Sequence, residues 1–411
     1  MVKPRNGWTT ATGRRQVTTA SNGGRTRLLS PSTMGRSNRS RVLQLLLQNG
    51  PTSRAELARS LGVNRATIAT ILQPLIEDGR LVEGEAVAAS PAGGKPARPL
   101  WFNSQGEELG SVRISSTRLT AARLSMDGTI RVAGQRTIDP SWPLPRISEH
   151  LLDLATECFD GRRLLGIGVA AAGMVDTTTG TILSLHLAPV MNGFAVADLL
   201  SSRFATSVSV DHHPRVLALG DRWFGLGRGV DHFASVYTGE ALGMGIVHAG
   251  EVFRGSHGAG GEYGHIVVDL RGATCLCGRR GCWETVATVG WLRARALERG
   301  LPGGAEASCT SLAALAADGH DGARELLAEY ADNLAIGLAN NEHMLASQTY
   351  IMHGDVVGGG ELVRSMLAER LAATAPHRDE PPTVVLDTSD EDTVLLGGGG
   401  LVLSSELATS Y

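Results

Sequence analysis

The sequence predicts an α/β protein in two parts, a small helical module followed by a larger body of alternating strands and helices. Apolar residues recur at helical spacing from about residue 38 to residue 85, whereas short β-like runs alternate with helical ones after residue 101. The net charge changes sign near the same boundary. Residues 1–103 carry 15 Lys and Arg and five Asp and Glu, whereas the remaining residues carry 23 Lys and Arg and 36 Asp and Glu. We therefore expect three segments, 1–34, 35–103 and 104–411.

The first segment, residues 1–34, is rich in Thr, Ser, Gly and Arg and has almost no apolar periodicity. Such a composition buries too little surface to offset chain entropy, so we expect a disordered basic tail. Met34 directly precedes the first periodic segment and is a candidate translation start. No apolar run long enough for a membrane span or a secretory signal occurs, which predicts a cytoplasmic protein without a membrane partner.

The second segment, residues 35–103, has the spacing of a helix-turn-helix. A first apolar helix ends near Asn49-Gly50-Pro51, and Ser53-Arg54-Ala55-Glu56 has the pattern of a capping box that opens a second helix. Gly62 supplies a tight turn, and Asn64 is positioned to cap a third helix. Val63, Ile68 and Ile71 are expected to pin this third helix across the second. Residues 80–83 and 100–102 are expected to form two strands around a Gly93-Gly94-Lys95-Pro96 loop. These features predict a winged helix-turn-helix, with a three-helix protein-interaction domain as the alternative.

The exposed side chains of the third helix are the expected readers of a double-stranded DNA operator. Residues near its N-terminus would reach base edges in the major groove, where Arg and Asn are well suited to bidentate contacts. Side chains on the second helix would lie nearer phosphates, and the wing would supply a further pair of cations. The predicted DNA-binding residues are Arg54, Asn64, Arg65, Thr67, Thr70, Lys95 and Arg98.

Three of the five cysteines fall within eight residues, at Cys275, Cys277 and Cys282, and His265 lies ten residues upstream of the first. This spacing is too tight and odd-numbered for a disulfide framework. Three thiolates and one imidazole form a closed tetrahedral ligand set, which predicts a structural Zn²⁺ site with no open position for a reactive water. Free thiols that bind no metal are the alternative. Cys158 and Cys309 stand apart and are expected to be buried thiols.

Two segments carry a family resemblance. Gly258-Ala-Gly-Gly-Glu-Tyr-Gly-His265 and Cys275-Leu-Cys-Gly-Arg-Arg-Gly-Cys-Trp-Glu284 resemble the signature of the ROK family, which contains repressors, open reading frames and sugar kinases. The helix-turn-helix with its Gly-Gly-Lys-Pro wing is similar to that of the transcriptional regulators of the family. The resemblance implies that the body has the two-lobed, actin-like (ribonuclease H-like) sugar-kinase fold with a cleft between the lobes.

The resemblance also implies that phosphotransfer residues have been lost. The first phosphate loop of the kinases, Asp-x-Gly-x-Thr, corresponds to a segment in which Arg113 replaces the acid and only Thr117 survives, because Ser115 and Ser116 replace glycines. In the second loop, Glu240 would place a carboxylate where phosphate must lie. The catalytic base corresponds to His213. Gly354–Gly360 and Gly397–Gly400 are expected to be glycine-rich turns near the nucleotide lobe.

Carried over residue by residue, the sugar contacts of the family correspond to Glu262, His265 and Glu284, all of which are retained. His265 would then bind zinc through one ring nitrogen and face the sugar with the other. Departures occur at His212, which replaces a contact Asn, and at Leu187 and Met191. A retained scaffold whose pocket no longer binds sugar is the alternative.

We therefore expect a sugar-responsive transcriptional repressor of carbohydrate-uptake or catabolic genes, without kinase activity. A sugar or a sugar phosphate would be its effector, and the body would form a homodimer or a dimer of dimers that matches a two-fold operator. Two alternatives stay open at this point: an active ATP-dependent sugar kinase, and a zinc-stabilised DNA-binding protein that responds to no ligand.

Overall fold

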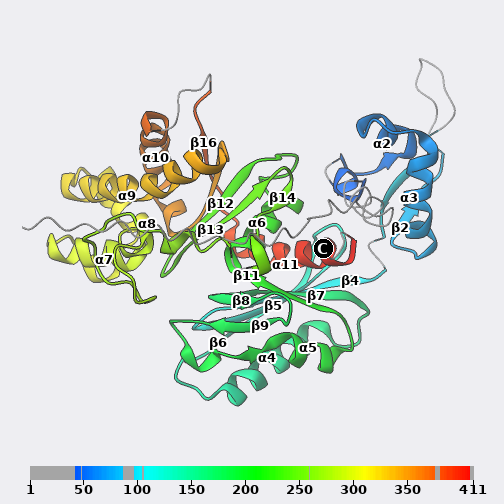
Figure 1. The fold of residues 1–411 in the computed structure, drawn as a ribbon, viewed down its shortest axis with the longest axis horizontal. Coiled ribbons are helices and arrows are strands. Elements are labelled where there is room, and N and C mark those ends of the chain that lie inside the picture. The colour runs from blue at the N-terminus through cyan, green and yellow to red at the C-terminus, as the bar shows by residue number, and fades with distance from the viewer. Residues whose placement is uncertain are drawn as a thin grey trace, which may run out of the picture.

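The computed structural model describes residues 42–47, 49–86, 97–103, 106–258, 260–374 and 380–407. The front of the chain forms helices and a three-stranded sheet of order β1-β3-β2 (Figure 1). Its elements are a helix over residues 42–47, β1 (Thr52–Ser53), α2 (Arg54–Ser60), α3 (Arg65–Glu77), β2 (Leu81–Glu83) and β3 (Pro99–Phe102). The tail 1–34, with Met34, and Lys95 in its Gly-Gly-Lys-Pro loop lie outside the described residues.

The helix-capping residues of the front module make the local hydrogen bonds that the sequence predicts. The Ser53 hydroxyl accepts from the backbone N–H of Glu56 while the Glu56 carboxylate accepts from the backbone N–H of Ser53, so the capping box is complete. Asn64 caps α3 through its side-chain oxygen, and Gly62 has a φ of 65° between the two helices. Val63, which we expected to pin α3 against α2, is instead 38% exposed.

The first lobe of the body contains a five-stranded sheet of order β11-β7-β4-β5-β6. β4 pairs antiparallel with β5 and parallel with β7, and β7 pairs parallel with β11. Helices α4 and α5 lie together on one side of this sheet (Figure 1). The elements are β4 (Glu108–Ile114), β5 (Arg118–Leu124), β6 (Ile130–Thr137), α4 (Leu144–Phe159), β7 (Leu164–Ala171), α5 (Val196–Phe204) and β11 (Val208–His212), with β8 (Met174–Asp176), β9 (Thr181–Ser184) and β10 (Phe194–Ala195) forming a small separate sheet.

The second lobe repeats this topology. Its sheet has the order β14-β13-β12-β15-β16, with two antiparallel pairings followed by two parallel ones. The elements are β12 (Phe233–Thr238), β13 (Leu242–His248), β14 (Glu251–Val252), α7 (Val289–Glu298), α8 (Cys309–Ala317), α9 (Asp321–Leu345), β15 (Thr349–Gly354), α10 (Gly360–Thr374) and β16 (Thr383–Leu386). Two lobes of the same strand order form the actin-like, ribonuclease H-like fold expected from the sequence.

Two helices join the lobes: α6 (His213–Trp223), which follows β11, and α11 (Asp390–Leu407), which returns from the second lobe to cross β7 and β4 of the first. Gly397–Gly400 lie inside α11 and do not form the turn that we expected. A Cβ at Gly397 would lie 2.0 Å from the carbonyl oxygen of Val216, and one at Gly398 would lie 2.1 Å from the hydroxyl of Ser111. The glycines therefore allow α11 to approach α6 and β4 closely.

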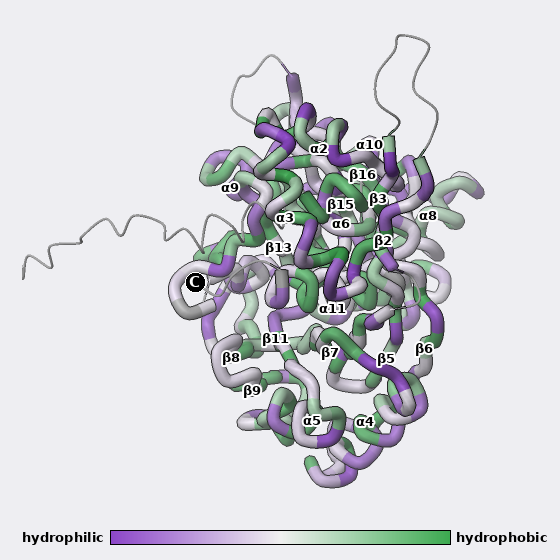
Figure 2. The backbone as a smooth tube through the Cα atoms, turned by 90° about the vertical axis from the view of Figure 1, so that its right-hand side faces the viewer, coloured by the Kyte–Doolittle hydropathy of each residue, from purple (hydrophilic) through white to green (hydrophobic). Residues whose placement is uncertain are grey.

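The front module packs against the body near the C-terminal end of α6. Buried residues of the module, including Leu43, Leu81 and Phe102, belong to one continuous apolar cluster with Leu124 and Trp223 of the body. In Figure 2 the hydrophobic segments gather around the central strands and helices, while hydrophilic segments dominate the outer loops. Among the described residues, no helix is both long and apolar enough to cross a membrane.

Candidate functional site

A cleft with a volume of about 650 Å³ lies between the two lobes. This volume is within the usual range for small-molecule sites. The cleft brings together residues that the sequence places more than 170 positions apart, from the end of β4 to the segment before α7. Most of the kinase-loop and sugar-contact positions discussed above line it: Arg113, Ser115, Ser116, Thr117, Leu187, His212, His213, Glu240, Glu262, His265 and Glu284. Met191 is buried and is not among the lining residues.

Two residues of the His and Cys cluster, His265 and Cys275, line one end of the cleft, which we call the metal end. The ligand atoms of His265, Cys275, Cys277 and Cys282 all lie within 4.8 Å of one another. Sγ of Cys277 is 3.6 Å from Sγ of Cys282, and Sγ of Cys275 is 3.6 Å from Nδ1 of His265. Gly281 has a φ of 70°, and a Cβ there would lie 1.6 Å from the carbonyl oxygen of Asp269, so this turn requires glycine.

These four residues could hold a metal ion. Tetrahedral coordination with metal–sulfur bonds of about 2.3 Å separates two sulfurs by roughly 3.8 Å, close to the observed separation of Cys277 and Cys282. The Cys275 thiol donates to Oε1 of Glu284 at 2.8 Å, and burial followed by this hydrogen bond raises the pKa of the thiol. Binding a metal would therefore release the Cys275 proton.

The predicted sugar contacts lie beside this cluster. Nδ1 of His265 is 3.4 Å from Oε1 of Glu284 and 3.6 Å from Sγ of Cys275, and His265 also lines the cleft. Glu262 precedes the same short helical turn as His265, and its Oε1 lies 3.4 Å from Nδ1 of His212. The geometry thus brings Glu262, His265 and Glu284 to one end of one cavity, where carboxylates and imidazoles are suited to sugar hydroxyls.

The loop that carries Glu262 is held by a buried charge network that we did not predict. The Asp211 carboxylate accepts from the guanidiniums of Arg215 at 2.6 Å and Arg254 at 2.8 Å, and Arg215 also donates to the carbonyl of Gly260 at 2.6 Å. Burial alone would raise the pKa of Asp211, but the two guanidinium charges outweigh it and hold the pKa below its usual value. The i,i+4 spacing of Asp211 and Arg215 was the only sequence feature that could have indicated this network.

The other end of the cleft is basic. Arg113, near the end of β4, lies 5.9 Å from the centre of the Tyr237 ring, and the turn from Ser115 to Thr117 follows it. His213, at the position of the kinase base, is only 8% exposed and packs edge-on against Tyr237. Burial, followed by the positive charge of Arg113, holds the pKa of His213 well below its usual range. The imidazole is therefore neutral at pH 7.

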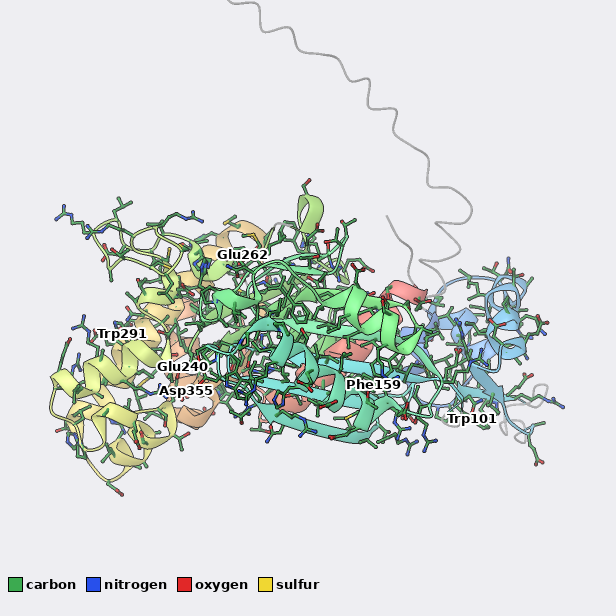
Figure 3. All side chains as sticks on the ribbon, turned by 90° about the horizontal axis from the view of Figure 1, so that it is seen from below. Trp101, Phe159, Glu240, Glu262, Trp291 and Asp355 are labelled. Carbon is green, nitrogen blue, oxygen red and sulfur yellow. The ribbon has the colours of Figure 1, made fainter. Side chains whose placement is uncertain are left out.

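Glu240 lies at the same end, beside Asp355 (Figure 3). Its carboxylate accepts from Arg293 of α7 at 2.6 Å, so the charge that we expected to repel phosphate is paired. Burial raises the pKa of Asp355, although hydrogen bonds from Cys309 oppose the shift. Cys309 and Cys158 are both buried, as the sequence predicts.

A second buried network connects α6 to the second lobe. Nε2 of His353 on β15 lies 2.8 Å from Oδ2 of Asp221 on α6, and its Nδ1 lies 3.7 Å from Oδ2 of Asp387. Ser235 of β12 donates to the same Asp221 oxygen at 2.5 Å. The network therefore fixes α6 to the sheet of the second lobe, because His353 and Ser235 come from two strands of that sheet.

The structure exposes the predicted DNA-reading surface of α3. Arg65 and Thr70 are exposed, as is Asn64, whose side chain caps the helix by accepting from the backbone and hydroxyl of Thr67. Two other predicted positions differ in their surroundings: Arg54 pairs with Glu83 of the wing strand β2, and Arg98 is exposed just before β3, with Lys95 outside the described residues.

The fold and the site together define a class of protein: a winged helix-turn-helix module attached to an actin-like sugar-kinase body. A ROK family model matches residues 109–404, and a model described as winged helix-turn-helix DNA-binding matches residues 36–82. The chain therefore belongs to the ROK family.

Individual relatives include both regulators and kinases. The chain is 28% identical to a putative xylose repressor of Caldicellulosiruptor sp. (strain Rt8B.4) over 61% of this chain and 63% of that protein, which is less than two thirds of the length of the relative. It is also 28% identical to the glucokinase of Thermotoga maritima, over 72% of this chain and 97% of the enzyme. The DNA-binding transcriptional dual regulator NagC of Escherichia coli is 29% identical over 63% of this chain and 64% of that protein.

Solved structures agree on the fold. A ROK family transcriptional regulator described as a homolog of the E. coli MLC protein superposes with a TM-score of 0.76 at 25% identity, covering 92% of this chain and 97% of that one. A ROK family glucokinase from Streptomyces griseus, solved with glucose and AMPPNP, superposes with a TM-score of 0.63 at 23% identity, covering 71% of this chain and 98% of the enzyme.

Proposed function

We propose that this chain is a transcriptional repressor of carbohydrate-uptake or catabolic genes whose affinity for its operator depends on a sugar-type ligand in the cleft. One observation carries the proposal: an exposed helix-turn-helix reading surface and an interlobe cleft with the sugar-side residues Glu262, His265 and Glu284 occur in one chain. The names of the xylose repressor and NagC relatives support the same function.

A substitution at Arg65 tests whether α3 contacts the operator bases. This side chain is exposed at the first position of α3 and makes no ion pair with a described carboxylate, so it is available for a base edge. Arg65→Ala should weaken operator binding by about 1–3 kcal/mol and relax specificity at one base position. Arg203→Ala is the matched control, because it removes the same charge from α5. An unchanged operator isotherm for Arg65→Ala would exclude α3 as the reader.

The cleft communicates with the DNA-binding module through α6. Its first residue, His213, lines the cleft, while near its last turn Arg222 donates to the side-chain oxygen of Gln44 in the first helix of the module, at 2.7 Å once the amide is oriented to accept. Trp223 joins the apolar cluster shared by the module and the body. A ligand that binds two lobe arrangements unequally would therefore shift the module through this helix.

Zinc is the metal that best suits the His and Cys ligand set, and its role would be structural. Three sulfurs and one nitrogen complete a tetrahedral site, so all four positions belong to the protein. When bound, the ion would hold the turn from Cys275 to Cys282 and fix the ring of His265 beside Glu284. The chain would act as a homodimer or a dimer of dimers on a two-fold operator.

The kinase alternative is favoured by the Thermotoga glucokinase relative, and the site argues against it. Phosphoryl transfer depends on positioning and neutralising phosphates, yet Arg113 and two serines replace the first phosphate loop and a neutral His213 replaces the carboxylate base. A coupled ATPase assay across a sugar panel should show no turnover above background. Turnover that disappears in His213→Ala would establish the kinase and overturn the regulator-only assignment.

A further inference from the structure

Two histidines face each other at the end of the second-lobe sheet that lies away from the cleft. His232 comes directly before β12, and His248 is the last residue of β13. The antiparallel register pairs Phe233 with Val247, so the next position along each strand places His232 opposite His248. Their ring centres are 4.7 Å apart, with 71° between the ring planes. The cleft lies at the other end of the same strands, where Leu242 lines it.

The separation of the two ring nitrogens suits a shared metal ion. Nδ1 of His232 lies 3.3 Å from Nδ1 of His248. A tetrahedral ion with metal–nitrogen bonds of about 2.0–2.1 Å separates two ligand nitrogens by roughly 3.3–3.4 Å, so the observed spacing already matches two imidazoles on one ion. One hydrogen bond between the rings is the alternative, but 3.3 Å exceeds the range of about 2.7–3.2 Å typical of protein N–H···O bonds.

A backbone donor keeps one of these nitrogens free of a proton. The N–H of Ala249, in the turn after β13, donates to Nδ1 of His232 at 3.4 Å. Because that nitrogen accepts, the proton of the neutral His232 ring is assigned to Nε2. His248 is exposed, so water can accept from its Nε2–H when its own Nδ1 carries no proton. Both rings can therefore present the unprotonated nitrogen that a metal ion requires.

The turn that carries His248 is fixed from two sides. The backbone N–H of Gly250 donates to the carbonyl of Asp231 at 2.9 Å, which ties the turn to the start of β12. On the next strand, Glu251 is paired with His248, and its carboxylate accepts from Arg222 of α6 at 3.2 Å. Two histidines on a hairpin that is already held lose little freedom when an ion binds them, and this preorganisation favours binding.

The charged groups around the turn do not oppose a cation. A Cβ at Gly250 would lie 3.4 Å from Oδ1 of Asp231 and 3.7 Å from a guanidinium nitrogen of Arg222, so both side chains flank the turn. Glu251 adds a second carboxylate. Two negative groups and one positive group therefore surround the pair, and the local balance of charge favours a bound cation.

We propose that His232 and His248 bind a Zn²⁺ ion through Nδ1 of each ring, with water in the remaining positions. Imidazole is a preferred ligand of zinc, whereas Mg²⁺ and Ca²⁺ prefer oxygen ligands. The site is separate from the cysteine cluster and from the cleft, so it goes beyond the proposed function and does not depend on it. An ion there would hold the hairpin whose Glu251 contacts Arg222, the residue that reaches Gln44 of the DNA-binding module.

The test is calorimetric titration of Zn²⁺ into the full-length protein, which is first loaded with Zn²⁺ and freed of excess so that the cysteine cluster is filled. Wild type should bind about one further ion per chain. His232→Gln and His248→Gln keep a polar side chain but lose the ring nitrogen. Each should lower the affinity for this ion at least about 10-fold, the cost of losing even an indirect partner of a metal ligand. His343→Gln removes an exposed histidine of α9 and should behave as wild type.

Thermal unfolding gives a second readout that does not depend on the stability of any one variant. Added Zn²⁺ should raise the unfolding midpoint of wild type and of His343→Gln, and should leave the midpoints of His232→Gln and His248→Gln unchanged, because only a folded protein with both rings binds the ion. Added Mg²⁺ should shift none of them. The absence of a further ion in wild type, or an equal Zn²⁺ affinity and midpoint shift in the two pair variants, would overturn the proposal.

Discussion

The two ends of the cleft differ in how fully their polar groups are satisfied. At the metal end, Cys275, His265 and Glu284 lie within hydrogen-bond or ion-pair distance of one another, and Glu262 is placed by a loop anchored to a buried ion network. At the basic end, Arg113 lacks a described counter-ion and Nε2 of His213 lacks a described partner.

This difference predicts which substitutions should reduce the stability of the protein and which should not. The groups at the metal end contact one another, so changes there should reduce stability as well as binding. At the basic end, the half-buried Arg113 makes no ion pair with a described carboxylate, so its replacement should leave the folded state intact.

The largest expected effect comes from the metal ligands. Cys277→Ser should remove about one bound metal ion per chain and destabilise the protein by roughly 5 kcal/mol or more, because one ligand of a closed site is lost. Metal content by mass spectrometry and thermal unfolding measure both. Cys158→Ser alters a buried cysteine outside the cluster and should retain the metal. Full metal content in Cys277→Ser would exclude the proposed ligand set.

The next effect in size is at Asp211. Asp211→Asn leaves Arg215 and Arg254 without their shared carboxylate, and breaking a buried pair in this way costs about 3–5 kcal/mol. Chemical denaturation should detect the loss, and sugar affinity should fall because Arg215 positions the loop before Glu262. Asp160→Asn makes the same chemical change in an exposed pair and should have little effect. Equal stability of the two variants would contradict the anchoring role of Asp211.

The low pKa of Asp211 also predicts how the stability of the protein changes in acid. Because this pKa is depressed in the folded protein, ionised Asp211 contributes its full stabilisation above the unfolded pKa of about 3.9. That stabilisation is lost as pH falls through the folded pKa. Denaturation midpoints between pH 7 and pH 3 should therefore fall less steeply for Asp211→Asn than for wild type. Parallel curves would indicate that Asp211 is not ionised in the folded protein.

The smallest expected effect is at Glu240. The side chains of Glu240 and its partner Arg293 are 63% and 39% exposed, and such surface pairs contribute about 0.2–1 kcal/mol. Glu240→Ala should change the unfolding free energy within that range and should not create ATPase activity, because Arg113 and His213 remain. Phosphotransfer gained by this one substitution would show that Glu240 alone blocks a competent nucleotide site.

Much of the front module was predictable because its signals act between near neighbours. The capping box of Ser53 and Glu56, the Asn64 cap and the Gly62 turn each depend on residues at most four positions apart. The two wing strands were also predicted to within about one residue, and the strand alternation and motifs of the body predicted its fold. The exposure of Val63 was missed, because nothing in its local sequence reveals how the third helix tilts.

By itself, the sequence determined the local elements, the family and the four clustered metal-ligand candidates, because those depend on spacing and residue chemistry. The tertiary structure alone decided that Arg254 would reach Asp211 across 43 residues, that Arg293 would pair with Glu240, and that the glycines of α11 would serve close helix packing. The reason is physical: these contacts form only when distant elements pack, and the free energy that selects them comes from burial of the whole core.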